Sequence, residues 1–401
     1  MRNLILLLSV LLPGAALPAQ AQLVSGRVLD AQTSQPIPYA SVAVLGTSQG
    51  TTCNAEGEFA LKMSALPGRL VFSQLSYRRD TVAVAAAGTL PVVRLLPAPV
   101  QLPDVKVENY VATLLTRAYE QLQRTHAQTN YGQAFYRQTT RNNGKPTELL
   151  EAVWDVTTTS AGVSGVRLAQ GRYAKVPGAF MNFSNFSEIT RMASAICGLD
   201  AADTTARRPV VRPGAGRFYQ LRLVGVTESN GRSVAEIDFV SLPGNDRPVT
   251  GSVFIALDNY QVLRARARRP LQLSQVESKG GMVEEYTTQV EVDFKPAGAG
   301  LSSRLIQASS VLRMKPRRQA VKTMETSSFA YFYDEMLRPT GLPYLSPDKP
   351  SRNLADIRQK PYDLAFWRDN PVVKRTPLEE EIVRSFESEK AFGTMLSPKQ
   401  K

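Results

Sequence analysis

Short stretches in which apolar and polar residues alternate run through most of this chain. In residues 133–140, for example, Tyr136 and Gln138 fall on one face and Arg137 on the other, and Asn143-Gly144 follows. Alternation with a period of two is typical of strands that bury one face, and an Asn-Gly pair favours a tight hairpin. The sequence therefore predicts a mainly β fold.

Residues 22–97 contain the densest run of such stretches. The expected strands are short, follow one another at regular spacing and show no helical period between them. Many short strands joined by regular turns favour a β-sandwich. We therefore expect the first folded domain to be a small sandwich that spans residues 22–97.

The turn and core residues of this domain occur in an order that resembles the carboxypeptidase-regulatory-like domain. The resemblance is carried by Gly26-Arg27-Val28, residues 36–42, Gly46-Thr47, Gly50-Thr51, residues 54–59 and residues 70–73. It implies a prealbumin-like, seven-stranded β-sandwich, which is abundant in exported proteins and TonB-dependent transporters of Bacteroidetes-type bacteria. The chain departs from this family at Ser76, where glycine is usual, and we interpret Ser76 as a position without positive φ.

Residues 1–21 have the features of a signal peptide. Arg2 supplies a positive charge, residues 4–12 form an apolar run too short to span a bilayer, and Ala19-Gln20-Ala21 fits a cleavage site. No cysteine follows that site, so we expect no lipoprotein anchor. Together with the resemblance, this predicts an exported protein in the periplasm, or associated with the outer membrane, of a Gram-negative bacterium.

Basic residues outnumber acidic residues in this chain. Lys and Arg number 48 against 35 Asp and Glu, which gives a net charge of +13. Such an excess favours anionic neighbours, which for an exported protein are lipid headgroups or acidic envelope glycans. The basic residues are dispersed rather than interleaved with aromatic residues, so no nucleic-acid partner is expected.

His126 is the chain's one histidine. A zinc carboxypeptidase site needs two histidines and a carboxylate, so the resemblance does not bring the peptidase activity with it. We expect no catalytic residue, no metal site and no cofactor. A hydrolase of unknown type that uses a carboxylate pair, Glu148 with Glu151 or Glu284 with Glu285, stays an alternative, although these residues fit solvent-facing strand charges better.

Cys53 and Cys197 are the two cysteines. They fall in different predicted domains, so a disulfide in an oxidising compartment would have to join those domains. Two unpaired, partly buried thiols are the favoured expectation.

A Pro-rich linker over residues 98–107 is expected to connect the sandwich to the rest of the chain. Its end, Asp104-Val105-Lys106-Val107, resembles a TonB box, the segment that adds as a strand to TonB, although a plain linker strand fits better. From residue 108 to about residue 124 the apolar period becomes helical. The expected buried face of this helix consists of Val111, Leu114, Leu115, Ala118, Tyr119 and Leu122.

Residues 108–335 are predicted to form this helix and a larger antiparallel β meander. Strands are expected at residues 133–140, 149–158, 166–173, 219–226, 233–240, 250–257, 262–268, 284–294, 303–314 and 326–333. The strand-turn-strand pattern of residues 251–264 resembles lipoprotein-carrier half-barrels, which wrap a curved sheet around an apolar cavity. A closed barrel and a second sandwich stay open as alternatives.

Residues 177–216 interrupt the predicted strands with an aromatic segment. Long insertions in β domains often serve as lids or binding loops. A lid over an apolar cavity would supply these candidate ligand contacts: Phe180, Met181, Phe183, Phe186 and Met192. The alternative is that these side chains fill the core of the sheet itself.

Residues 336–401 are expected to form a Pro-rich wrapping tail and a C-terminal helix. Residues 361–367 are aromatic enough to dock on the protein, and they resemble the end of exported Bacteroidetes proteins that carry the same sandwich. Thr376, Pro377 and Glu379 form a helix start, with an N-cap, a first-position proline and an acid two residues later.

The inner face of that C-terminal helix is expected to hold Leu378, Ile382 and Phe386, which share one side at helical spacing. Gly393 is the predicted stop.

These features together predict a non-enzymatic envelope protein with a binding or scaffold role. One version binds an apolar ligand or lipid in the C-terminal sheet, and another binds periplasmic or outer-membrane proteins through the sandwich. The alternatives are an accessory component of TonB-linked outer-membrane transport and the hydrolase named above.

Overall fold

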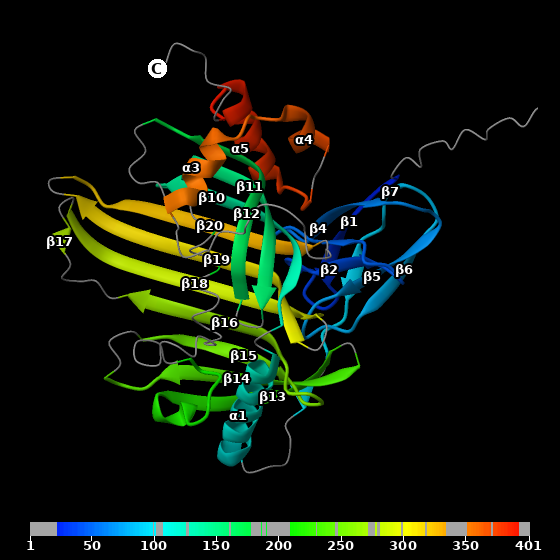
Figure 1. The fold of residues 1–401 in the computed structure, drawn as a ribbon, viewed down its shortest axis with the longest axis vertical. Coiled ribbons are helices and arrows are strands. Elements are labelled where there is room, and N and C mark those ends of the chain that lie inside the picture. Colours follow the sequence, from blue (N-terminus) through cyan, green and yellow to red (C-terminus); the bar gives the residue numbers. More distant parts are fainter. Residues whose placement is uncertain are drawn as a thin grey trace, which may run out of the picture.

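The fold is described from a computed structural model of the chain (Figure 1). The structure describes residues 22–98, 100–101, 107–125, 128–159, 162–177, 186, 190, 209–229, 231–244, 248–271, 277–278, 281–297, 300–316, 319–333, 351–369 and 372–392. The expected signal peptide, His126, Cys197 and all but the last residue of the TonB-box-like segment lie outside these residues.

The N-terminal domain is a sandwich of two sheets. Its strands are β1 (Gln22–Asp30), β2 (Ser41–Val44), β3 (Gly50–Thr52), β4 (Glu58–Met63), β5 (Gly68–Ser73), β6 (Asp80–Val84), β7 (Gly88–Thr89) and β8 (Val93–Leu95). One sheet has the order β4-β1-β7, with β8 also paired to β1, and the other has the order β3-β2-β5-β6. Because β7 and β8 pair with successive parts of β1, they share one strand position, which leaves the seven positions that the resemblance implies.

The alternation in this domain places its apolar residues between the two sheets. Val28, Val42, Phe59 and Phe72 are fully buried there, and the rings of Phe59 and Phe72 meet edge to face with centroids 5.4 Å apart. Gly26 lies so close to this core that a Cβ on it would fall 2.8 Å from Cε1 of Phe59. This close approach explains the glycine.

The turn at Ser76 corrects the interpretation drawn from its residue type. Ser76 has a φ of 70°, so the backbone keeps the left-handed conformation although no glycine is present. The carbonyl of Ser76 accepts a 2.9 Å hydrogen bond from the amide of Ala98, and the amide of Tyr77 donates to Gln74 at 3.1 Å. These bonds hold a conformation that costs a non-glycine residue about 1 kcal/mol.

The second domain is built on one sheet of 12 strands. It contains all of the predicted strands and two further strands of two residues each, β9 and β17. The strands are β9 (Val100–Gln101), β10 (Asn130–Asn142), β11 (Lys145–Thr159), β12 (Gly162–Lys175), β13 (Tyr219–Ser229), β14 (Arg232–Ser241), β15 (Thr250–Ala256), β16 (Val262–Leu271), β17 (Glu277–Ser278), β18 (Gly281–Ala297), β19 (Gly300–Pro316) and β20 (Lys322–Tyr333).

The spatial order of these strands is not one continuous meander. The path is β12-β11-β10-β20-β19-β18-β16-β15-β14-β13-β9, with β17 beside β18. β10 pairs with β20 from Gln133–Tyr333 to Asn142–Met324, so the first strands of the domain join the last. The path has two ends, β12 and β9, and the described strands therefore form an open sheet, which twists strongly in Figure 1, rather than a closed barrel or a second sandwich.

Helices cover both faces of the sheet (Figure 1). α1 (Val107–Thr125) packs against β13 and β19, and α3 (Ser351–Gln359) packs against β12 at the other edge. We call the face that α1 and α3 contact the inner face. The sandwich, α4 (Leu364–Asp369) and α5 (Pro377–Ser388) lie on the outer face. The predicted inner side of α1 is confirmed, with these side chains buried: Val111, Leu114, Leu115, Ala118 and Leu122.

α5 begins as the sequence predicts and buries two of the three residues expected on its inner face. The side-chain oxygen of Thr376 accepts a hydrogen bond from the Glu379 amide, and the carboxylate of Glu379 accepts one from the Thr376 amide. The predicted capping box is therefore confirmed. Leu378, however, is 39% exposed, and Val383 is buried in its place beside Ile382 and Phe386. The prediction for Leu378 is wrong because the first turn of the helix directs Glu379 toward Arg137 of the sheet and leaves Leu378 toward solvent.

The tail also contains structure that its proline content did not predict. Residues 351–359 are the helix α3 rather than an extended wrapping segment. α5 ends at Ser388, and Lys390, with a φ of 51°, takes the left-handed position just beyond it. The predicted stop, Gly393, lies outside the described residues. None of the described helices is both long enough and apolar enough to cross a membrane.

Candidate functional site

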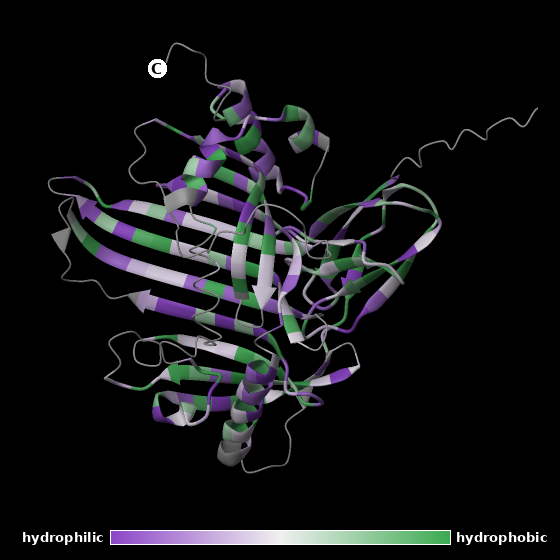
Figure 2. Ribbon diagram, in the orientation of Figure 1, coloured by the Kyte–Doolittle hydropathy of each residue, from purple (hydrophilic) through white to green (hydrophobic). Residues whose placement is uncertain are grey.

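β11 runs through the part of the sheet where both faces are covered. Residues 147–158 of this strand are all buried, although an antiparallel strand commonly exposes one face. Alternate side chains point to opposite faces, so Glu148 and Leu150 face inward whereas Leu149 and Glu151 face outward. Figure 2 shows polar and apolar residues alternating along the neighbouring long strands. The two faces have different chemistry.

The inner face is apolar over most of its area. One cluster joins α1, α3, the strands from β10 to β16 and the strands from β18 to β20, and its sheet residues include Tyr136, Trp154, Ile237, Val253, Val292, Ile306 and Phe332. Phe186 from the insertion stacks on Trp154, with ring centroids 5.2 Å apart and planes 8° apart. It also meets Tyr136 edge to face at 5.4 Å.

Phe186 is the candidate ligand contact that the structure describes. Its ring is fully buried and packs on the inner face against Trp154 and Tyr136. Phe180, Met181, Phe183 and Met192 lie outside the described residues, so the role of the insertion as a lid stays a prediction.

A band of polar side chains crosses the inner face beside this apolar cluster. We call it the polar belt, and its members are Gln138, Thr140, Glu148, Tyr173, Ser310, Thr326 and Ser328. Thr140 lies opposite both Glu148 and Thr326 on its neighbouring strands. Glu148 accepts hydrogen bonds from the hydroxyl of Thr140 at 2.8 Å and from the hydroxyl of Tyr173 at 2.7 Å.

Two buried atoms of the belt have no hydrogen-bond partner within the described part of the chain. They are Nε2 of Gln138 and Oγ1 of Thr326, on side chains that are 1% and 4% exposed. The hydroxyl of Tyr136 donates to Oε1 of Gln138 at 2.6 Å, which fixes the amide with Nε2 turned away from Tyr136. A buried polar atom left unpaired costs about 1–3 kcal/mol, so a native protein retains one for a reason.

A second apolar cluster borders the belt on its far side. It consists of Val283, Leu312, Met314 and Met324 from β18, β19 and β20. The belt is therefore a polar line between two apolar patches on one face of the sheet.

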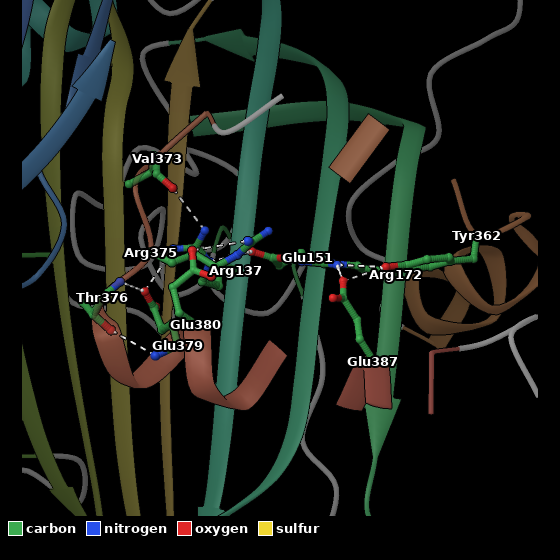
Figure 3. A network of polar contacts seen from close by, with 10 residues as sticks. All are labelled: Arg137, Glu151, Arg172, Tyr362, Val373, Arg375, Thr376, Glu379, Glu380 and Glu387. Carbon is green, nitrogen blue, oxygen red and sulfur yellow. Dashed lines mark hydrogen bonds and ion pairs between the residues drawn. The ribbon is translucent and has the colours of Figure 1, made fainter. Parts of the chain in front are cut away.

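The outer face of β10, β11 and β12 carries a buried ion network (Figure 3). Glu151 is fully buried at its centre. One of its oxygens accepts from Nε of Arg137 at 2.7 Å, and the other accepts from Nε of Arg172, also at 2.7 Å. Arg375 places a third cation 3.5 Å from the first oxygen. Three strands and the C-terminal segment thus meet at one carboxylate.

Each strand arginine also binds the C-terminal segment directly. Arg137 donates to Glu379 at 3.1 Å and to the carbonyl of Val373 at 3.1 Å. Arg172 donates to Glu387 at 3.1 Å and to the hydroxyl of Tyr362 at 3.2 Å. These bonds join β10 and β12 to α5 and to the segments on either side of α4.

The charges of this network stabilise one another. Burial alone would raise the pKa of Glu151, but Arg172 and Arg137 outweigh burial and hold the pKa of that carboxyl well below its ordinary value. Burial alone would lower the pKa of Arg137, and Glu379 and Glu151 raise it instead. Each buried charge therefore has an opposite charge in contact, which is the condition under which buried ions are tolerated.

A second ion cluster lies under the sandwich on the same outer face. Nε of Arg264 donates to Asp293 at 2.5 Å, and Arg304 binds the same carboxylate. Burial would raise the pKa of Asp293, but Arg264 and Arg304 lower it. Arg264 also donates to Gln74 of the sandwich at 2.8 Å.

Further contacts hold the sandwich on the outer face. The ring of Tyr39 packs against Phe329 of β20 with centroids 5.7 Å apart. The hydroxyl of Thr51 donates to the carbonyl of Val372 at 2.9 Å, and Lys374 pairs with Glu58 of the sandwich at 3.1 Å. The sandwich and the C-terminal segment thus brace each other on one side of the sheet.

The carboxylates proposed as a hydrolytic pair do not lie together. Glu148 and Glu151 are both fully buried, so their interpretation as solvent-facing charges is wrong. They point to opposite faces of β11 and cannot act on one substrate. Glu284 and Glu285 are 31% and 45% exposed and lie 3.8 Å and 3.9 Å from Arg313, as surface strand charges would.

Cys53, the possible metal ligands and one small cavity are the remaining candidates for a chemical role. Cys53 is unpaired and buried, and burial raises the pKa of its thiol. Within the described residues, His, Cys, Asp and Glu do not gather in groups of three that could hold a metal ion. A cavity of about 20 Å³ between β10, β11 and β19, lined in part by Tyr131, Thr158 and Ser302, has room for about one water molecule.

Comparisons with known proteins identify the N-terminal domain. Residues 24–107 match the family of the CarboxypepD_reg-like domain. The resemblance read from the turn and core residues is thereby confirmed. None of the curated proteins matches the chain in sequence.

Solved structures show a looser likeness. The MucA/MucB complex of Pseudomonas aeruginosa has a TM-score of 0.20 at 10% identity and covers 55% of this chain and 93% of its own. A LolA superfamily protein from Nitrosomonas europaea has a TM-score of 0.20 at 11% identity and covers 56% and 93%. A domain described as an outer-membrane lipoprotein-sorting protein, from Vibrio parahaemolyticus, has a TM-score of 0.24 at 11% identity and covers 61% and 98%. All three TM-scores lie below 0.5, so these likenesses carry no argument about the fold or the site of this chain.

Proposed function

We propose that this protein is a non-enzymatic protein of the bacterial envelope that binds an acyl chain on the inner face of its sheet. The observation that carries the proposal is the difference in chemistry between the two faces of β10, β11 and β12. Their outer face is occupied by the ion network and by α4 and α5, whereas their inner face belongs to a continuous apolar surface that α1, α3 and Phe186 contact and that the polar belt borders. A curved apolar surface with few, specific polar groups is the usual form of a site for an apolar ligand.

Ala308 marks the part of the inner face where a chain would lie. It is half-buried on β19 and packs at the border of the large apolar cluster. It lies opposite Ser328 of the polar belt. Because the side chain of Ala308 is small, it leaves room for a ligand on the sheet between the apolar cluster and the belt.

Two substitutions at adjacent positions test this proposal. Ala308→Phe places a ring on the inner face, and Ser309→Phe places the same ring on the outer face, where Ser309 is exposed. In a titration with a fluorescent acyl probe, we expect Ala308→Phe to weaken binding at least about tenfold by occupying the site, and Ser309→Phe to bind as the wild type does. Equal affinities for the two variants would overturn the proposed site.

The envelope location follows from the expected signal peptide and from the family of the sandwich, and it is part of the proposal. Cell fractionation tests it. Recovery of the protein, shortened by its first 21 residues, with periplasmic or outer-membrane material is the expected result, and recovery at full length from the cytoplasm would contradict it.

A further inference from the structure

We infer that the polar belt binds the uncharged polar group of an amphiphile, such as the hydroxyls and ester of a monoacylglycerol or the amide of a fatty amide. This inference rests on the proposed function, because it concerns the head of the ligand whose chain lies on the inner face. It names a ligand class and the residues that select it.

The belt lies between two apolar clusters, a large one around Tyr136 and Trp154 and a smaller one around Leu312 and Met324. A chain on either patch would bring its polar end to the belt. A purely apolar ligand would leave the belt's buried polar atoms without partners, which is unfavourable.

The belt offers two buried polar atoms to a ligand. Nε2 of Gln138 is a donor, and the Thr326 hydroxyl is both donor and acceptor; neither has a partner in the part of the chain that the structure describes. Gln138 and Thr326 lie on paired strands, two residues apart in register. Their side chains are on the same face within reach of one small polar group. A carbonyl or hydroxyl oxygen would satisfy both.

The charges around the belt also select the polar group of a ligand. Glu148 lies in the same belt, and its two oxygens accept from Thr140 and Tyr173. Arg358 also meets Tyr173, with its guanidinium 5.0 Å from the ring centroid, so Glu148 already has a cation nearby. A carboxylate ligand would add a second negative charge beside that single cation, and like charges in a shared site oppose each other. The belt therefore favours an uncharged group, in contrast to the net charge of +13, which attracts anions to the protein as a whole.

The experiment uses the purified full-length protein and four probes. The apolar dye N-phenyl-1-naphthylamine reports on the inner face, and monopalmitoylglycerol, palmitamide and palmitate compete with it. For the wild type, we expect the two uncharged competitors to bind at least about tenfold more tightly than palmitate.

Thr326→Val removes the hydroxyl while it keeps the shape of the side chain. It should weaken monopalmitoylglycerol binding about three- to tenfold, the effect of one hydrogen bond, and leave dye binding unchanged. Thr326→Ser is the matched control, which keeps the hydroxyl and should bind as the wild type does. The melting temperature of ligand-free Thr326→Val should be equal or higher, because an unpaired buried atom has been removed.

The outcomes separate the two proposals. If the wild type binds neither the dye nor any competitor, the proposed function is wrong. If it binds the dye but holds palmitate as tightly as monopalmitoylglycerol, or if Thr326→Val and a second variant, Gln138→Leu, keep wild-type affinity, the inference about the belt is wrong and the acyl-binding site stands. Loss of affinity in Thr326→Ser would also overturn the inference, since packing rather than the hydroxyl would then be responsible.

Discussion

The two faces of β10 and β11 treat buried polar groups in opposite ways. On the outer face, Glu151 and Arg137 are buried and every charge is matched by a partner from another strand or from the C-terminal segment. On the inner face, Gln138 and its neighbour Thr326 on β20 keep buried atoms without partners in the described chain. The same strands thus carry a completed joint on one side and an incomplete set of bonds on the other. A completed joint indicates a structural role, and an incomplete set indicates a place for a ligand.

Removing the central charge of the outer network should have the largest effect. Glu151→Gln leaves Arg137 and Arg172 buried without their shared carboxylate, and we expect it to lower the free energy of unfolding by about 3–5 kcal/mol. Glu285→Gln, at a half-exposed position, is the control and should change it by about 0.5 kcal/mol at most. Urea unfolding measures both. A loss below about 1 kcal/mol for Glu151→Gln would mean that the network is not a structural joint.

The packing of α5 offers a comparison of similar size. Phe386 is buried between α5 and the outer face, whereas Leu378, on the same helix, is 39% exposed. Phe386→Ala should destabilise the protein by about 3 kcal/mol, and Leu378→Ala by about 0.5 kcal/mol. Thermal unfolding distinguishes them. Equal losses of stability in the two variants would mean that Leu378 is buried on the inner face of α5, as the sequence predicts.

Acid should act on the outer face through Glu151. Because the folded pKa of this carboxyl lies below its ordinary value of 4.5, its contribution to stability is fully present above that value and is lost as the pH falls toward the folded pKa. The difference in unfolding free energy between the wild type and Glu151→Gln should therefore be constant from about pH 7 to pH 5.5 and shrink below about pH 4. A difference that does not change down to pH 2 would contradict this.

The helix cap should give the smallest of these effects. Thr376→Ala removes the side chain that accepts from the Glu379 amide and should cost about 1 kcal/mol. Thr376→Ser keeps the cap and serves as the control. If both variants lose the same amount, the methyl group of Thr376, rather than its hydroxyl, stabilises the start of α5.

Local sequence patterns predicted most of the elements and which side chains share a face. Alternation in β10 placed Tyr136 and Gln138 together and Arg137 opposite, as the structure has them. The capping residues of α5 were equally informative because a cap involves neighbours in the sequence. Such features depend on a few adjacent residues, and the chain encodes them directly.

Long-range partners could not be read in the same way. The pairing of β10 with β20 joins residues far apart in the chain, from Gln133 with Tyr333, 200 positions apart, to Asn142 with Met324, 182 positions apart. Alternation does not predict which strand lies beside which. Glu151 looked like a surface charge because its partners, Arg137 and Arg172, come from other strands. One feature of the sequence could have indicated this burial. Glu151 has apolar neighbours on both sides, in the run Leu149-Leu150-Glu151-Ala152, and a charge in such a strand needs a buried partner. The polar belt is assembled from five strands and was missed for the same reason.

The most direct test of the account is to identify what the protein carries. Protein purified from the envelope of its own cells is extracted with organic solvent, and the extract is analysed by mass spectrometry for the wild type, Ala308→Phe and Ser309→Phe. The account predicts an uncharged acyl amphiphile with the wild type and Ser309→Phe and its loss from Ala308→Phe. Extracts without any acyl lipid from the wild type, or the same lipid in equal amounts from both variants, would contradict it.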